Sequence, residues 1–209
     1  MVELFAANIH QIAPRAGELI ALVDQERQAR IRAFGDSRSG LRTLAAGLLL
    51  YAIFGEQTSH PHFERGRRGK PVLPDHAPFN ITHAGDYAVL ALSKQSVGVD
   101  LEQFRPLDWR RIAERFFHPE ERAFLSRSQE PEKDFFRIWT LKESYLKAEG
   151  TGFSVSPASF AVLPSGESSA TFFGETNYRF EQLSAFPGYC LSVCSLEDTV
   201  SPSVILKEF

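Results

Sequence analysis

The chain has 209 residues, of which 43% are hydrophobic, 23% are charged and 12% are aromatic, and this composition excludes general disorder. The length allows one large domain or two small ones with a sizeable core. A formal net charge of -3 excludes an overall attraction to nucleic acid or to an acidic membrane. The chain opens without a basic leader and a long apolar stretch, so we expect a cytoplasmic protein without a membrane span.

The first half of the sequence predicts helices followed by strands. Apolar residues recur at helical spacing over residues 18–34 and 38–54, and Gly, Pro, His and basic residues then indicate loops up to about residue 79. Extended segments follow at residues 79–83, 87–92 and 97–102. The simplest interpretation is a hairpin that leads into a third strand.

The second half repeats this order. Helices are expected over residues 109–116, 119–126 and 132–149, with Pro119 and Pro131 in first-turn positions, and a mostly extended tail follows. Helices then strands, twice over, predict an α+β fold made of two similar halves that meet near residue 105.

Two acidic residues lie on one expected strand. Asp100 and Glu102 are two residues apart in Gly98-Val-Asp-Leu-Glu102, so both carboxylates point to one face of the strand. Adjacent anions repel unless a cation neutralises them, and Mg²⁺ prefers oxygen ligands. The alternative is a solvated strand end.

The segment 136–150 carries a second set of charged residues. Trp139, Glu143 and Lys147 recur every four residues and therefore share one helical face. Glu143 is a candidate third oxygen ligand or general base, with Lys142 and Lys147 on an anionic substrate. The alternative is a surface helix with Trp139 packed beneath it.

Basic residues before the hairpin form a third feature. Arginines are frequent between residues 27 and 42 and between residues 65 and 70, and Lys70 ends the second group. So much local positive charge on a net-negative chain predicts a phosphate-rich ligand. A patch that aids solubility or binds RNA is the alternative, and His83 is either a core histidine or a phosphate donor.

Four segments taken together resemble the signature set of the 4'-phosphopantetheinyl transferases, in their larger, surfactin-synthetase-activating (Sfp-like) branch. These segments are Gly69-Lys-Pro71, Phe79-Asn-Ile-Thr-His83, Gly98-Val-Asp-Leu-Glu102 and Trp139-Thr-Leu-Lys-Glu-Ser-Tyr-Leu-Lys147. Their order and spacing agree with the family over residues of about 20 to 155.

The resemblance implies transfer of the phosphopantetheine arm of coenzyme A to a serine of an apo acyl or peptidyl carrier protein, with release of adenosine 3',5'-bisphosphate. It also implies two α+β halves related by a pseudo-twofold axis, with the active site in the cleft between them. We expect residues 1–105 to contact coenzyme A, and residues 106–209 to supply the catalytic helix 132–149 and the carrier-docking surface. The basic and aromatic segment 105–119 is the expected docking site.

Site residues carry over by position. The resemblance assigns Mg²⁺ to Asp100, Glu102 and Glu143. Because phosphoryl transfer needs charge neutralisation and a base for the serine proton, Lys147 and Glu143 are the candidate catalytic residues. It places Lys142 and Lys147 near the pyrophosphate, Gly69, Lys70 and Pro71 near the adenine, and Arg27, Arg30, Arg42, Thr82 and His83 around the 3'-phosphate.

Two rival functions use the same residues. The three acids and the basic groups would also serve another Mg²⁺-dependent transfer or hydrolysis at a nucleotide phosphate. A non-catalytic module that binds coenzyme A or RNA would need only the basic residues, although RNA binding predicts aromatic residues within the basic patch. We expect a monomer that binds neither nucleic acid nor membranes.

Overall fold

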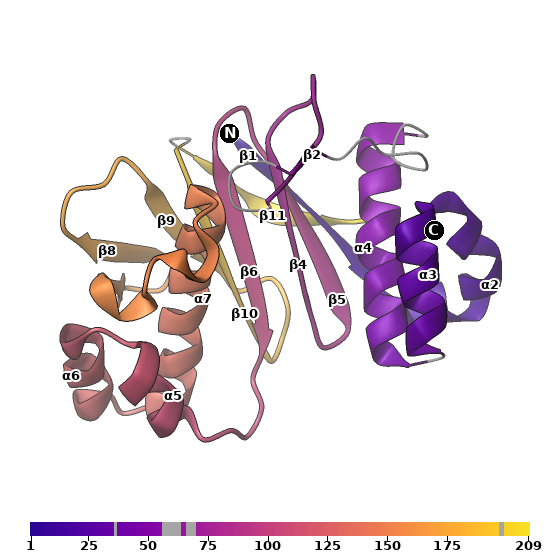
Figure 1. Cartoon of the computed structure of the whole chain (residues 1–209). Coiled ribbons are helices and arrows are strands. Elements are labelled where there is room, and N and C mark those ends of the chain that lie inside the picture. The colour runs from indigo at the N-terminus through magenta and orange to yellow at the C-terminus, as the bar shows by residue number, and fades with distance from the viewer. Residues whose placement is uncertain (36, 56–63, 66–69, 197–198) are drawn as a thin grey trace.

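The structure is a computed structural model, and it describes residues 1–35, 37–55, 64–65, 70–196 and 199–209. The α+β fold in two halves is confirmed: helix α4 (Arg38–Phe54) lies beside one sheet, and helix α7 (Pro131–Glu149) lies beside the other (Figure 1). Among the described helices, none combines the length and the apolar character that crossing a bilayer requires.

The first sheet has the strand order β11-β1-β5-β4. Its strands are β1 (Val2–Asn8), β4 (Phe79–Ala84), β5 (Tyr87–Leu92) and β11 (Val200–Leu206). Strands β4 and β5 form the predicted antiparallel hairpin, whereas β1 pairs with β11 in parallel. A small separate sheet pairs β2 (Glu64–Arg65) with β3 (Pro71–Val72).

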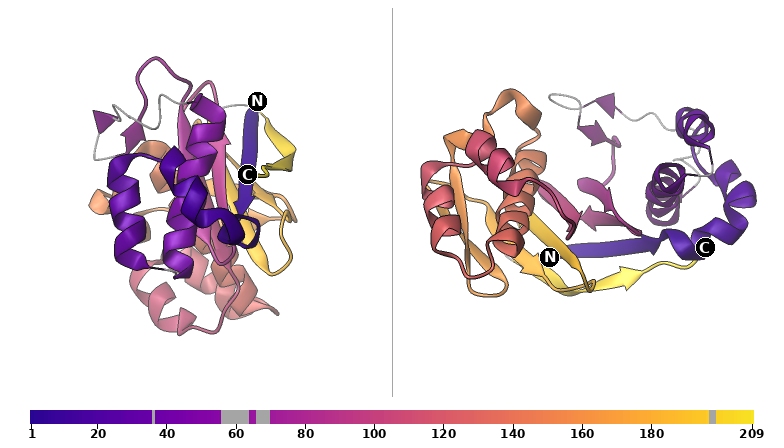
Figure 2. Two further views of the ribbon diagram at one scale, coloured as in Figure 1. Left: turned by 90° about the vertical axis from the view of Figure 1, so that its right-hand side faces the viewer. Right: turned by 90° about the horizontal axis from the view of Figure 1, so that it is seen from below.

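Helix α4 covers one face of the first sheet, and the other helices of this half pack around α4, as the two views in Figure 2 show. These helices are α1 (Ile9–Ile12), α2 (Ala16–Leu19), α3 (Gln25–Phe34) and α4 (Arg38–Phe54), with 3-10 turns at Ala13–Arg15 and Ile20–Leu22. The prediction of a helix over 38–54 is confirmed. The prediction of one continuous helix over 18–34 is wrong, because Asp24 caps α3 through the backbone N–H of Arg27 and so begins a new helix.

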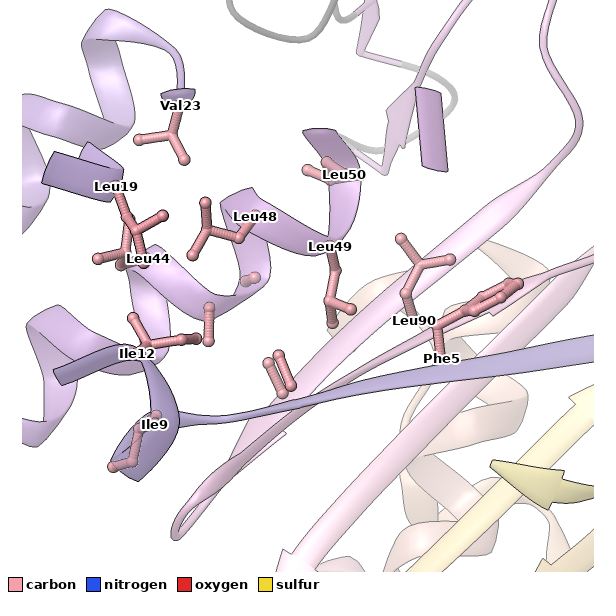
Figure 3. Packing of buried hydrophobic residues seen from close by; sticks show 14 of the residues in the cluster. Phe5, Ile9, Ile12, Leu19, Val23, Leu44, Leu48, Leu49, Leu50 and Leu90 are labelled. Atoms are coloured by element: carbon pink, nitrogen blue, oxygen red, sulfur yellow. The ribbon is translucent and has the colours of Figure 1, made fainter. Parts of the chain in front are cut away.

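The core of the first half lies between α4 and the sheet. Leu49 of α4 points toward Leu90 of β5 and Phe5 of β1, while Leu44 of the same helix lies beside Ile12 and Leu19, and all of these side chains are buried (Figure 3). Burial of large apolar side chains contributes about 1.5–3 kcal/mol each, so this contact fixes α4 on the sheet.

The second sheet has the strand order β6-β10-β9-β8-β7. Its strands are β6 (Val97–Gln103), β7 (Ala161–Ser165), β8 (Ser169–Phe173), β9 (Arg179–Leu183) and β10 (Tyr189–Ser195). Helices α5 (Trp109–Phe116), α6 (Pro119–Arg127) and α7 (Pro131–Glu149) precede β7, with 3-10 turns at Gly152–Ser154 and Pro157–Ser159. All three helices predicted for this half are confirmed.

The two sheets share a buried apolar layer. Val99 and Leu101 of β6 and Val193 of β10 pack against Leu4 and Val89 of the first sheet. Strand β6 also lies beside β4 (Figure 1). Two side-chain oxygens of β4 accept hydrogen bonds from the β6 backbone. The Val99 N–H donates to Oδ1 of Asn80 at 2.9 Å, and the Leu101 N–H donates to Oγ1 of Thr82 at 3.4 Å. The acidic strand is therefore held by both halves.

The strand pairing differs from a division of the chain at residue 105. Strand β6 pairs along its whole length with β10 of the second sheet, so its backbone belongs to the second half. In the opposite direction, β11 follows the second half in sequence but pairs with β1 of the first.

Candidate functional site

Helix α7 packs directly on the acidic face of β6. Gly98 shares that face with Asp100 and Glu102, and a Cβ atom at Gly98 would lie 2.0 Å from the backbone oxygen of Ser144. The glycine thus allows α7 to approach closely enough for Glu143 and Lys147 to lie near the two strand carboxylates. Val99 and Leu101 point to the other face, into the layer between the sheets.

Asp100 is the centre of a buried hydrogen-bond network. Lys147 donates from Nζ to Oδ1 of Asp100 at 2.6 Å, to the backbone oxygen of Val99 at 3.1 Å and to Oγ1 of Thr82 at 3.3 Å. The Thr82 hydroxyl in turn donates to Oδ1 of Asp100 at 3.3 Å. The other carboxylate oxygen, Oδ2, is buried without a hydrogen-bond partner. A buried oxygen of this kind is available to a cation.

The three predicted acids influence one another electrostatically. Burial, and then the negative charge of Asp100, raise the pKa of Glu143, while Lys147 opposes the shift and Glu102 adds to it. Burial also raises the pKa of Asp100 against the attraction of Lys147. Within the described part of the chain, however, no three His, Cys, Asp or Glu side chains are close enough to hold an ion as they stand. Glu102 accepts instead from Nη1 of Arg105 at 2.7 Å.

Basic residues gather at the end of β4. Arg42 of α4 donates from Nη1 to the backbone oxygen of Gly85 at 3.2 Å, which places its guanidinium beside the β4–β5 turn. The pKa of His83 is lowered, first by desolvation and then by the positive charges of Arg42, Lys147 and Arg30. His83 and Arg30 are exposed, so these cations surround a surface that an anion can reach.

Two residues predicted for the same region have other partners. Arg27 donates from Nε to Oδ2 of Asp24 at 3.1 Å, so part of its charge is neutralised. Thr82 is buried, with its hydroxyl among Asp100, Lys147 and the Leu101 backbone. The structure thus places Thr82 with the acidic strand rather than on the exposed basic surface.

A cavity of about 320 Å³ lies between the two halves. It is lined by Lys70, Val72, Leu73, His76, Ala77, Pro78, Phe79, Ser96, Ala148, Glu149 and Gly150. Lys70 donates from Nζ to the backbone oxygen of Val97 at 2.8 Å, and burial lowers the pKa of this amine to about 8. Pro71 begins β3, and Gly69 lies outside the described residues.

The prediction that Lys142 lies near a pyrophosphate is corrected by the structure. Lys142 is 1% exposed, and its Nζ donates to both carboxylate oxygens of Glu121 at 2.7 Å and to the backbone oxygen of Phe160 at 2.8 Å. All three protons of the ammonium group therefore have partners inside the protein. Lys142 joins α7 to α6 and β7 on the side away from Asp100.

Sequence reasoning missed Glu121 and Arg105, the partners of two predicted site residues. Glu121 accepts from the backbone N–H of His118 at 2.8 Å and of Val162 at 2.9 Å, in addition to Lys142. A Glu three residues after a helix-capping position is a known signal for the first of these bonds. No comparable sequence signal marks the ion pair of Glu121 with Lys142 or the ion pair of Glu102 with Arg105.

Aromatic residues of the expected docking segment lie largely in the core. Phe117 is 1% exposed and stacks on Phe135 at 5.2 Å between ring centroids, and Phe116 meets Trp139 edge-on at 5.9 Å. Trp109 is buried as well, whereas Arg110 and Arg111 beside it are exposed. The accessible part of this segment is therefore mainly basic.

Comparisons with known proteins match nearly the whole chain. A family model described as the 4'-phosphopantetheinyl transferase superfamily matches residues 96–194, and a second, described as the N-terminal part of 4'-phosphopantetheinyl transferase, matches residues 14–95. The two models meet between β5 and β6, where the strand pairing also changes sheet.

Curated relatives cover most of the chain as well. The 4'-phosphopantetheinyl transferase psf-1 of Bacillus pumilus is 32% identical over 90% of this chain and 84% of its own length. The transferase gsp of Aneurinibacillus migulanus is 30% identical over 88% of this chain and 81% of its own length. The transferase Sfp of Bacillus subtilis is 28% identical over 84% of this chain and 83% of its own length.

Proposed function

The chain belongs to the 4'-phosphopantetheinyl transferase superfamily, and from this premise we infer that it is an enzyme that modifies carrier proteins. It transfers the 4'-phosphopantetheine arm of coenzyme A to a serine of an apo acyl or peptidyl carrier protein and releases adenosine 3',5'-bisphosphate. The family resemblance noted in the sequence is thereby confirmed, with its Sfp-type organisation in two pseudo-twofold halves.

The acidic face of β6 under α7 is the observation that supports this reaction most directly. Members of the family typically use Mg²⁺, and we propose that Asp100, Glu102 and Glu143 hold it here. The residues fit a hard cation, because Oδ2 of Asp100 is buried without a partner, and because burial and then repulsion from Asp100 raise the pKa of Glu143, which a bound cation would counteract. When bound, Mg²⁺ neutralises charge on the pyrophosphate oxygens.

Lys147 and Glu143 are the proposed catalytic residues. Lys147 carries positive charge beside Asp100, where it can stabilise charge that develops on the leaving phosphate. The serine Oγ forms a bond to the phosphorus that carries pantetheine, and the bond from this phosphorus to the adenosine-side oxygen breaks. Glu143 takes the serine proton directly or through a water, and its raised pKa suits that role.

In this proposal the two basic regions bind different parts of the coenzyme A nucleotide. Arg42, His83 and Arg30 form the exposed surface for the 3'-phosphate, and Arg27 adjoins it on α3. The adenine occupies the cavity beside Lys70 in this proposal. Pro71 follows Lys70 at the start of β3, and the role expected for Gly69 falls outside the described residues. Lys142 has no part in coenzyme A binding, because its ammonium group is enclosed by Glu121 and Phe160.

We also propose that the enzyme acts as a monomer in the cytoplasm. All the proposed site residues come from one chain, since β4 and α4 of the first half and β6 and α7 of the second meet at the site. The two cysteines, Cys190 and Cys194, are buried free thiols, which agrees with a reducing compartment.

The activity is tested by incubating the protein with apo carrier proteins, coenzyme A and Mg²⁺, and by intact-mass measurement. We expect a gain of one phosphopantetheine per carrier and loss of this gain with a chelator. Product analysis separates this reaction from other nucleotide phosphate chemistry, because it must yield adenosine 3',5'-bisphosphate. A panel covering fatty-acid, polyketide and peptide carriers that shows no mass change would refute the proposed activity.

Replacement of Asp100 tests the proposed site. We expect Asp100→Ala to lose at least about 99% of turnover, in line with removal of a group that stabilises transition-state charge. Glu167→Ala, an exposed acid in the β7–β8 turn, is the matched control and should keep normal turnover. Near-normal rates in a folded Asp100→Ala protein would remove this residue from the site.

A further inference from the structure

Glu102 already has a cationic partner from the protein itself. Arg105 donates from Nη1 to Oε2 of Glu102 at 2.7 Å and to the backbone oxygen of Gln103 at 3.4 Å. Its guanidinium lies 5.9 Å from the ring centroid of Phe136. The side chains of Arg105 and Glu102 are 55% and 22% exposed, so an ion from solvent can reach the pair.

The other strand carboxylate is held in the same manner. Lys147 binds Oδ1 of Asp100 and leaves Oδ2 buried without a partner. In the residues that the structure describes, the acids are not gathered closely enough to form a three-ligand site. Both acids of β6 are paired with protein cations, so a metal that binds Glu102 meets Arg105 on the same carboxylate.

Arg105 is the partner that can leave at lower cost. Lys147 is 28% exposed and has two further acceptors, Thr82 and Val99, that hold it in place. Arg105 is more exposed, and apart from Glu102 it donates within the described residues to the backbone oxygen of Gln103, at 3.4 Å. Solvent stabilises a displaced guanidinium, and exposed ion pairs of this kind contribute little to stability.

We propose that Arg105 is the counter-ion of Glu102 in the metal-free enzyme, and that a divalent cation competes with Arg105 for this carboxylate. The proposal rests on the proposed function, because it takes Glu102 as a metal ligand. Two cations on one carboxylate repel each other, so binding of either weakens binding of the other. Arg105 thus sets how tightly the site holds metal.

Release of Arg105 also affects the connection between the site and α5. Arg105 lies in the segment that follows β6 at Gln103 and precedes α5 at Trp109, next to the exposed Phe104. Its bond to Glu102 ties this segment to the acidic strand. Metal binding therefore frees the start of the segment that leads into the basic helix.

The test compares Arg105→Gln with Arg111→Gln, an exposed arginine of α5 whose replacement changes the net charge equally. Mn²⁺ serves as the probe, and free Mn²⁺ is measured by electron paramagnetic resonance with saturating coenzyme A and no carrier protein. We expect Arg105→Gln to bind Mn²⁺ about three- to fivefold more tightly, the range that loss of an exposed ion pair permits. Arg111→Gln should change the affinity by less than half as much.

Equal shifts in the two variants would show a general charge effect and overturn the proposal, as would weaker Mn²⁺ binding in Arg105→Gln. Hydrogen exchange of a peptide spanning residues 103–109 provides a second measurement. Mg²⁺ with coenzyme A should speed its exchange in the unmodified protein and have little effect in Arg105→Gln; unchanged exchange in the unmodified protein overturns the link to the segment. Neither measurement needs turnover, so a failed transferase assay remains distinguishable from a failure of this competition.

Discussion

The surroundings of Glu143 make ionisation of its carboxyl group unfavourable. Burial and the charge of Asp100 raise its pKa above the usual 4.5, and the attraction of Lys147 offsets only part of this shift. A carboxyl group whose pKa is raised on folding binds its proton more tightly in the folded state. The stabilisation that the protonated group gives is therefore present below the pKa of the unfolded state. It is lost as the pH rises through the higher pKa of the folded state.

Glu143→Gln should consequently stabilise the metal-free protein at pH 8. Because the amide cannot ionise, we expect its free energy of unfolding to exceed that of the unmodified protein by up to about 1 kcal/mol. The gap should narrow as the pH falls towards 4, where Glu143 is mostly protonated in both states. Urea unfolding with a chelator at several pH values measures this, with Glu167→Gln as the control; a gap that is the same at pH 4 and pH 8 would contradict the explanation.

Arg42 provides a separate prediction about the nucleotide. If its guanidinium binds the 3'-phosphate, coenzyme A should bind more tightly than dephospho-coenzyme A, and Arg42→Ala should abolish this preference. Charge-assisted hydrogen bonds to phosphate make a loss of about 1.5–3 kcal/mol reasonable. Isothermal titration with both nucleotides measures it, and Arg15→Ala, an exposed arginine paired with Glu18, is the control. Equal affinity of the unmodified protein for both nucleotides would refute the assignment without affecting the transferase activity.

Helical spacing explains which site residues were predictable. Glu143 and Lys147 are four residues apart, share a face of α7 and both lie near Asp100, as the sequence indicated. Lys142 is adjacent to Glu143 in sequence, but consecutive helical residues are about 100° apart around the axis, so it points elsewhere. The family motif contains both lysines and does not distinguish their directions.

At the scale of elements, the buried pair of Glu121 and Lys142 joins α6, α7 and β7. Lys142→Met would leave the Glu121 carboxylate buried without its cation, and we expect a loss of about 3–5 kcal/mol in the free energy of unfolding. Lys133→Met is the matched control, because Lys133 forms an exposed pair with Glu130 on the same helix and should change stability by less than about 1 kcal/mol. Urea unfolding measures both, and similar values for the two variants would show that burial of the first pair adds nothing.

Helix α4 was predicted well because its long apolar segment lies between a serine cap and Gly55, although residues 43–50 are buried all round the helix. Helix α4 agrees with its predicted range at both ends, and Ser37 caps it. Strand β1 was missed because nearly all of its residues are buried, which removes the alternation that marks a strand. Phe5 faces the core under α4 while Leu4 and Ala6 face the second sheet, so burial on both faces hides the pattern.

At the scale of the whole molecule, pairing between distant segments determines the two halves. Val2 pairs with Val200 in parallel, and β6 leaves the hairpin that precedes it to pair with β10. Neither pairing has a local signal, because strand partners are selected by packing of entire sheets. The division at residue 105 therefore followed the order of helices and strands along the chain, whereas the sheets divide between β5 and β6.

We propose that the carrier protein approaches the side of the molecule where the acidic strand β6 and the helices of the second half meet. Helix α5 begins shortly after Glu102, and Arg110 and Arg111 are exposed on it. Carrier proteins as a class present an acidic helix beside the modified serine, so these arginines would attract and orient them. Burial of Trp109 and Phe117 in the core means that the contact depends mainly on charge.

Charge reversal tests this docking surface. We expect Arg111→Glu to raise the Michaelis constant for the carrier about three- to tenfold, with little change for coenzyme A, because attraction across the interface becomes repulsion. The rate should also depend less on salt, since fewer attractive charges remain for ions to screen. Steady-state kinetics with each substrate varied in turn, at two ionic strengths, separate these effects. Arg15→Glu makes the same change of charge on the first half and should leave the Michaelis constants for the carrier and for coenzyme A unchanged. Equal responses of the two variants would place carrier docking on another surface.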